Sequence, residues 1–230
     1  MKLEPPEKKR PPRRRSTART GETRDEILTA ALQQFAEYGF HGASLREISK
    51  RSGVPLSALH YHYGSKDGLF FAAVGQVFAR LSEARLERLT ALRRTETPLA
   101  LEQLLEAFIR PTIELASAPE GPSFMRLQSR VYAENAPLSD QLTKLVLDAT
   151  HPFRAALEEI MPEVPDAIRY RGYRIMVSSL SGVPVDPMYE QLAKRAALPR
   201  RKRDIEALID LLVSYHAAGF RSLQQSAAAS

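Results

Sequence analysis

The sequence contains no cysteine among its 230 residues. This absence excludes disulfide bonds, thiolate nucleophiles, and zinc or iron–sulfur sites built on cysteine. Apolar runs are short as well, and none approaches the ~18 residues that a transmembrane helix needs. The basic N-terminus is not followed by an apolar stretch, so it is not a secretory signal. Together these features predict a cytoplasmic protein that does not use a membrane as a partner.

Strand signals are also scarce. Leu, Ala, Arg, Glu and Gln dominate most windows, and apolar residues recur at intervals of three and four rather than alternating. This spacing predicts an all-α protein. The chain is long enough for one large domain or two modest ones.

The positive charge is concentrated at the N-terminus. The whole chain carries +6, and residues 1–24 hold nine Lys/Arg against three Asp/Glu, so the remainder is neutral. Residues 1–22 include four prolines and almost no large apolar residue, which predicts a disordered basic arm. A phosphate-rich partner would meet this arm first. A solvated leader that only aids solubility explains the same composition equally well.

The first helix after the arm is expected to begin at Thr23, a suitable N-cap, and to end at Gly39, a suitable C-terminal glycine. Its apolar positions recur at helical spacing and form one face. They are Ile27, Leu28, Ala31, Leu32 and Phe35. This face predicts a helix that packs on the elements that follow it.

Two short helices and a tight turn follow. The stretch Ser44 to Glu47 has the spacing of a capping box and predicts the start of a second helix, which ends at Gly53. Pro55 suits the start of a short helix that reaches Tyr63. Ser65 is the expected N-cap of a fourth helix that runs to about Leu92. Two short helices joined by a glycine-containing turn are typical of a helix-turn-helix, so residues 23–68 are predicted to be a DNA-binding domain.

The third helix would lie in the major groove of DNA, and its residues divide between core and groove. The inward positions should pack against Leu32 and Phe35, and they are Leu45, Ile48, Val54 and Leu59. Tyr63 is also expected in the core. The positions left to divide between groove and core are Leu56, Ser57, Ala58, His60, Tyr61 and His62.

These residues resemble the DNA-binding domain of the TetR family of bacterial regulators. The matching features occur in order: A-x-x-x-F-A-x-x-G-F at 31–40, S-L-R-E-I-S at 44–49, S-G-V at 52–54, and H-Y-H-Y-G-S-K-x-x-L-F at 60–70. The resemblance implies a homodimer with an N-terminal reading head on each subunit. It also implies a larger C-terminal helical domain, residues 69–230, that dimerises and binds a small effector.

The same resemblance assigns DNA contacts by position. It implies that Ser44 and Lys66 hold phosphates and that the start of the third helix approaches the DNA. The full set of candidate DNA-binding residues is Ser44, Arg46, Leu56, Ser57, Ala58, His60, Tyr61 and Lys66. Pro55, Leu56 and Ala58 depart from the usual family pattern. Residues 25–68 carry four basic and five acidic residues, so we hypothesise that the basic arm supplies the missing electrostatic attraction.

The remaining chain predicts longer amphipathic helices at 98–117, 122–134, 138–161, 165–181 and 204–224. Pro111 and Pro152 fall inside two of them and should kink their axes. Residues 182–203 form a long connection, with a short helix considered at 187–197. The helices 165–181 and 204–224 carry apolar stripes that would pair with a second copy in a four-helix interface.

The candidate effector-binding residues lie in this C-terminal part, and they are Phe108, Phe124, Arg126, Leu127, Arg130, Tyr132 and His151. Ordinary bundle core explains each apolar member as well, and surface ion pairs explain the arginines. A weaker resemblance to TetR members that answer fatty-acid-type ligands favours an apolar effector.

We therefore expect a ligand-responsive transcriptional regulator, a repressor released from a palindromic operator by a small apolar effector. A non-specific architectural DNA-binding protein and a helical enzyme are the alternatives. The enzyme is disfavoured because the chain has no G-x-S-x-G, H-E-x-x-H or phosphate-binding glycine loop. We expect no cofactor and no metal, since two histidines at i and i+2 point to different faces of a helix.

Overall fold

The computed structural model describes residues 16–95, 98–119, 121–133, 140–182 and 205–229, with Gln191 and Arg195. Every regular element in these ranges is a helix, which confirms the all-α prediction. The helices are α1 (Ser16–Gly42), α2 (Leu45–Ser52), α3 (Leu56–Tyr63), α4 (Lys66–Thr95), α5 (Leu101–Ser117), α6 (Gly121–Ala133), α7 (Asp140–Ile160), α8 (Asp166–Gly182) and α10 (Ile205–Ala228). Within these residues, no helix is both long enough and apolar enough to cross a membrane.

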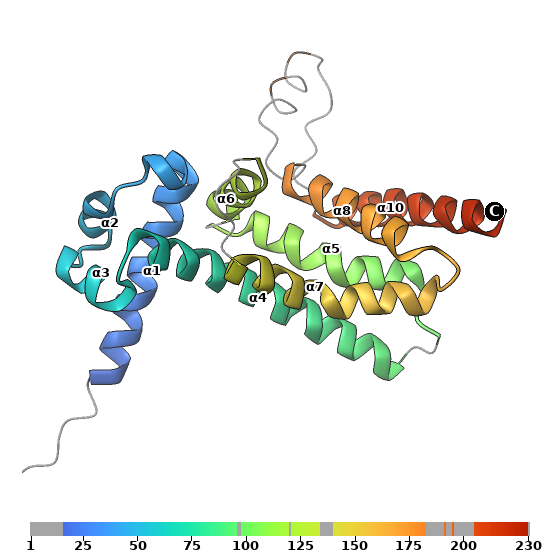
Figure 1. Cartoon of the computed structure of the whole chain (residues 1–230), viewed down its shortest axis with the longest axis horizontal. Helices are drawn as coiled ribbons and strands as arrows, with labels where there is room; N and C mark the ends of the chain where they lie inside the picture. The colour runs from blue at the N-terminus through green and yellow to red at the C-terminus, as the bar shows by residue number, and fades with distance from the viewer. Residues whose placement is uncertain are drawn as a thin grey trace, which may run out of the picture.

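The helices form two parts connected by α4 (Figure 1). The head comprises α1, α2, α3 and the beginning of α4, and the body comprises α5 to α8, α10 and the rest of α4. The 30 residues of α4 extend from one part to the other. In the body, α5 packs against α4, α7, α8 and α10. This arrangement leaves α2 and α3 at the end of the molecule remote from α10 (Figure 1).

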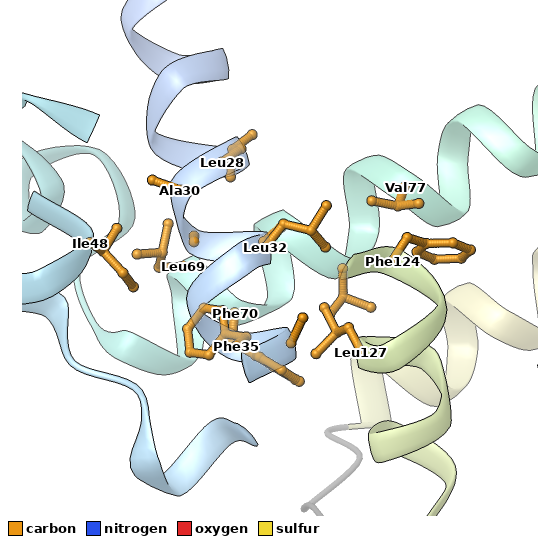
Figure 2. Packing of buried hydrophobic residues seen from close by; sticks show 14 of the residues in the cluster. Leu28, Ala30, Leu32, Phe35, Ile48, Leu69, Phe70, Val77, Phe124 and Leu127 are labelled. Carbon is orange, nitrogen blue, oxygen red and sulfur yellow. The ribbon is translucent and has the colours of Figure 1, made fainter. Parts of the chain in front are cut away.

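The core of the head is built on the apolar face predicted for α1. Ile27 and Phe35 are fully buried, and Ile48 of α2 and Leu59 of α3 pack in the same cluster. Figure 2 shows that Phe124 and Leu127 of α6 also reach this cluster. The hydrophobic core therefore continues past residue 68, where the sequence suggested a domain boundary, and joins the head to the body.

A glycine interrupts α1 at the position where the sequence predicts its end, three residues before the last residue of the element, Gly42. Gly39 has φ 69° and ψ 178°, which interrupts the helical backbone and redirects the chain toward α2. A residue without a Cβ adopts this positive φ at little cost, which explains glycine at this position. Phe40 follows and stacks near Phe35, with 6.3 Å between ring centroids.

The predicted start of α1 at Thr23 is wrong, because the helix begins at Ser16. The last proline of the basic segment is Pro12, so no proline stops the helix from extending seven residues toward the N-terminus. Residues 1–15 and, apart from Gln191 and Arg195, the short helix considered at 187–197 lie outside the described residues. Pro111 and Pro152 lie inside α5 and α7 as predicted.

Candidate nucleic-acid interface

The turn between α2 and α3 is fixed by side-chain hydrogen bonds as well as by glycine. Gly53 ends α2 in the left-handed conformation, with φ 69° and ψ 9°. The hydroxyl of Ser49 donates to the carbonyl oxygen of Val54 at 2.6 Å, and the amide of Val54 donates to the hydroxyl of Ser52 at 3.4 Å. These contacts hold the two helices of the helix-turn-helix at one angle, which a rigid reading head requires.

The inner face of the helix-turn-helix is anchored in the core of the head. Ile48, Val54 and Leu59 are buried, and Leu45 packs against them. Because these side chains face α1, the opposite side of α3 faces solvent. The predicted inward positions are thus confirmed.

The outward face of α3 carries hydrogen-bonding and aromatic side chains. Ser57, His60 and His62 are exposed, and Tyr61 is 84% exposed, the highest value among the large exposed hydrophobic side chains of the described residues. The rings of Tyr61 and His62 lie edge to face, with centroids 5.2 Å apart. Leu56 is half-buried, and Ala58 packs against the core of the head, so these two contribute less to the outward face than the sequence suggested.

His60 is held by the end of its own helix. Its Nδ1 lies 3.2 Å from the carbonyl oxygen of Gly64. A carbonyl oxygen only accepts hydrogen bonds, so Nδ1 carries the proton in this contact. The neutral ring then presents Nε2 as an acceptor, and the protonated ring presents it as a donor.

The N-terminus of α2 differs from the prediction in one detail. Ser44 occupies the N-cap with an extended backbone, but its side chain makes no capping hydrogen bond, so the predicted capping box is wrong. Ser44 is half-buried, whereas Arg46 and Glu47 are exposed. The exposed Glu47 does not close the reciprocal bond that a capping box needs.

Lys66 at the start of α4 contacts the protein itself. Its Nζ donates to the carbonyl oxygen of His41 at 3.0 Å and lies 5.1 Å from the ring centroid of Phe40. The ammonium group therefore stabilises the last residues of α1, where it faces partial negative charge. An ammonium has three donors, so one hydrogen bond does not exhaust its capacity for a phosphate.

Gly68 is a structural residue of the head that sequence reasoning missed. A Cβ at this position would lie 2.2 Å from the carbonyl oxygen of Tyr63. The amide of Gly68 also donates to the hydroxyl of Ser65 at 3.1 Å, which confirms Ser65 as the N-cap of α4. Only glycine allows α4 to begin this close to the end of α3. A glycine in the first turn of a helix was the available signal.

Tyr63, predicted in the core, is half-buried and packs against the core of the head. Its hydroxyl is buried, and this burial raises the pKa of Tyr63, while nearby Arg24 opposes the shift.

The structure divides the candidate effector-binding residues that it describes among different places in the fold. Phe124 and Leu127 belong to the core of the head, whereas Phe108 belongs to the core of the body. Arg130 donates to the carbonyl oxygen of Glu37 at 3.1 Å, and Arg126 donates to that of Pro122 at 3.2 Å. His151 is exposed, and the side chain of Tyr132 lies outside the described residues.

The described residues contain no group of three or more His, Cys, Asp or Glu side chains placed to hold a metal ion. The exposed side chains on the outward face of α3 can form hydrogen bonds and can stack on flat groups. Such side chains contact phosphates and base edges in protein–DNA complexes.

Two family models match the chain. The model described as "Bacterial regulatory proteins, tetR family" matches residues 27–73, which include the whole helix-turn-helix. The model described as "Tetracyclin repressor-like, C-terminal domain" matches residues 106–219. The two matches follow one another along the chain, the first within the head and the start of α4 and the second within the body.

Curated relatives carry matching descriptions. The HTH-type transcriptional regulator RutR of Escherichia coli (strain K12) is 34% identical over 118 residues, which are 51% of each chain. The HTH-type transcriptional repressor BepR of Brucella suis is 29% identical over 149 residues, 63% of this chain and 69% of that protein. The chain thus spans about half the length of RutR.

A solved structure has the same fold. The fatty acid degradation regulator FadR from Bacillus halodurans superposes with a TM-score of 0.56, covering 84% of this chain and 96% of that chain, at 16% identity. An N-terminal helix-turn-helix and a C-terminal helical domain are common to both.

Proposed function

The chain belongs to the TetR family of bacterial transcriptional regulators, and we propose that it is a repressor that a small apolar effector releases from a palindromic operator. Its family makes it a DNA-binding regulator. The relative BepR is itself described as a repressor. A repressor has to meet the bacterial chromosome, so we propose that the protein acts in the cytoplasm.

The observation that carries the proposal is the outward face of α3. Ser57, His60 and Tyr61 project from a helix whose opposite side is buried and whose turn is held by hydrogen bonds. A side chain held on a rigid element keeps its orientation without further ordering when it meets a base or phosphate. This face supports a role for α3 as the recognition helix in the major groove.

The proposed dimer interface is the exposed apolar face of α8 and α10. Ile175 of α8 is 66% exposed, and Leu211 and Tyr215 of α10 are 64% and 71% exposed. Of the predicted apolar stripes, Met176, Ile209 and Leu212 are buried within one chain, so the surface left for a partner is made by their exposed neighbours. A two-fold dimer would present two α3 helices to the two halves of a palindrome.

Selection of DNA by the full chain tests this function. The protein is incubated with a random duplex library at physiological salt, and bound fragments are sequenced over several rounds. We expect an inverted repeat whose half-sites are separated by about one helical turn, 10–10.5 base pairs, or a multiple of it. Native mass spectrometry of the complex should give two chains per duplex. Retention of DNA without any enriched sequence would indicate an architectural DNA-binding protein instead.

A further inference from the structure

The contact between head and body contains a cleft of about 460 Å³, a size typical of small-molecule sites. We call it the seam cleft, and its lining is Asp25, Leu28, Thr29, Leu32, Ala73, Gln76, Val77, Arg80, Leu115 and Phe124. We propose that the seam cleft binds a small apolar molecule with one anionic group, and that this molecule is the effector. The second part of this inference rests on the proposed repressor function.

The two long walls of the cleft have the same pattern. On α1 the lining residues are spaced i, i+3, i+4 and i+7 from Asp25, and on α4 they have this spacing from Ala73. One face of each helix therefore lines the cleft. Figure 2 shows Leu28 and Leu32 on α1, with Val77 of α4 and Phe124 of α6 beside them.

The buried lining residues form an apolar floor of the cleft, and the exposed lining residues form a polar mouth. Leu32, Val77 and Phe124 are buried apolar side chains, as are Leu28 and Ala73. The exposed lining residues are polar: Asp25, Thr29, Gln76 and Arg80. An apolar floor with a few polar groups at its edge is the usual composition of a small-molecule site.

The mouth of the cleft contains one acidic and one basic side chain, Asp25 on α1 and Arg80 on α4. The amide of Gln76 donates to the carboxylate of Asp25 at 3.3 Å, which satisfies the acidic end of the mouth. Arg80 lies one helical turn further along α4, and its guanidinium group has five N–H donors, so it can bind a ligand in addition to a partner within the protein. A carboxylate or sulfonate would be attracted to Arg80, so the ligand class is an apolar body with an anionic head.

The side chain of Phe108, one of the candidate effector contacts, is buried in the interior of the body. The Phe108 ring lies edge to face against Phe153 at 4.9 Å and against Tyr173 at 5.5 Å. The guanidinium carbon of Arg85 lies 3.5 Å from the centroid of the same ring, and its Nη2 donates to Thr112 at 2.7 Å. The ring of Phe108 is therefore already packed against two aromatic rings and a guanidinium group.

A ligand in the seam cleft would contact both matched regions of the chain. Leu28 lies on α1 and Ala73 at the start of α4, both in the head. Leu115 lies on α5 and Phe124 on α6, which are helices of the body, although the Phe124 side chain packs in the core of the head. An occupant therefore binds one head-to-body angle more tightly than others, and this difference in affinity is what shifts the position of α3.

The experiment uses two probes with the same ring system, the anionic 8-anilino-1-naphthalenesulfonate and the uncharged N-phenyl-1-naphthylamine. Each is titrated by fluorescence into the full chain without DNA. Thr29→Trp and Gln76→Trp place an indole on each wall of the cleft, and Thr90→Trp adds the same group at an exposed position of α4 outside it. Arg80→Gln removes the cation, and Arg94→Gln is its control on the same helix.

We expect both wall variants to weaken both probes at least tenfold and Thr90→Trp to weaken neither. Arg80→Gln should weaken only the sulfonate, by about tenfold, and Arg94→Gln should leave both unchanged. Equal affinities in the wild-type chain and in both wall variants would overturn the seam cleft as a binding site. An equal effect of Arg80→Gln on both probes would overturn the anionic ligand class.

A second titration on the selected operator separates the two proposals. Saturating sulfonate should weaken operator binding of the wild-type chain about five- to 150-fold, the usual range of allosteric coupling, and should not affect Thr29→Trp. Unchanged operator affinity would overturn the effector role while leaving the site. A chain that binds the probe in the cleft but selects no operator would instead overturn the proposed repressor function.

Discussion

Arg130 of α6 donates a hydrogen bond from Nη2 to the main-chain carbonyl oxygen of Glu37 on α1, at 3.1 Å. This contact joins the body to the last helical turn before Gly39, where carbonyl oxygens lose their helical partners. The carboxylate of Glu37 pairs with Arg51 of α2 at 3.3 Å, so the same residue also contacts the helix-turn-helix. Glu37 is therefore a point at which the body, α1 and α2 meet.

Replacement of Arg130 by Met should weaken this joint. The change removes the hydrogen bond to Glu37 while keeping a long side chain, and we expect a loss of about 1 kcal/mol in the free energy of unfolding. Chemical denaturation measures it. Arg126→Met is the control on the same helix: it removes a charge that also acts on the carboxylate of Glu37, but its hydrogen bond to Pro122 stays within α6. Equal losses in both variants would contradict a specific role for the Arg130–Glu37 contact.

Gly68→Ala should destabilise the head. The added Cβ would meet the carbonyl oxygen of Tyr63 at 2.2 Å, so α3 and α4 must move apart. We expect a cost of about 1–3 kcal/mol and a fall of roughly 3–10 °C in Tm, with weaker DNA binding. Gly75→Ala on the same helix is the matched control, since its Cβ would meet only Leu145 at 3.8 Å. That variant should be neutral or more stable, because alanine favours helix over glycine by up to about 1 kcal/mol.

The sequence predicted the elements of the head because their signals are local. The glycines at 39 and 53, the cap at Ser65 and the buried faces of α1 and α2 each follow from a short pattern of residue types. Gly68 was missed because its role depends on the distance between two helices. Sequence periodicity marks Phe124 and Leu127 as buried, but it does not reveal that they pack on α1 rather than inside the body. Long-range packing also places Phe124 and Leu127 in a different core cluster from Phe108, which sequence periodicity does not reveal.

His216 should make stability depend on pH. It is buried between α8 and α10, where its Nε2 lies 2.8 Å from the hydroxyl of Ser179, and burial lowers the pKa of His216. The unfolded chain then binds the proton more readily than the folded chain. The stability that neutral His216 contributes is complete above the unfolded pKa of about 6.5 and is lost as pH falls through the lower folded pKa.

Unfolding free energies at pH 7.5 and pH 5.5 test this expectation. His216→Gln cannot be protonated in this range and keeps a polar group beside Ser179, so it should lose less stability on acidification than the wild-type chain. His151→Gln, at an exposed position, should behave like the wild-type chain. If the unfolding free energy of His216→Gln falls between pH 7.5 and pH 5.5 by as much as that of the wild-type chain, groups other than His216 cause the pH dependence.

Deletion of residues 2–15 should reduce the salt dependence of DNA binding. This segment holds seven Lys/Arg and two Asp/Glu, and its removal leaves α1 intact from Ser16. Each lost phosphate contact should reduce the slope of log K against log salt by about 0.9. Operator affinity measured between 50 and 200 mM salt gives the slope. An unchanged slope would show that the basic arm does not contact DNA.

The most direct test of the DNA-binding account is the affinity of Tyr61→Ala and of the double variant His60→Ala/Tyr61→Ala for the selected operator. Fluorescence anisotropy at fixed salt measures the dissociation constant, and thermal unfolding is recorded in parallel. Tyr61 is 84% exposed, so its removal should leave Tm unchanged. Each lost contact should cost about 1–3 kcal/mol, so we expect at least a fivefold loss for the single variant and more for the double one. Leu86→Ala, at an exposed position of α4, should bind like the wild-type chain. Wild-type affinity in the double variant would contradict the assignment of α3 as the recognition helix.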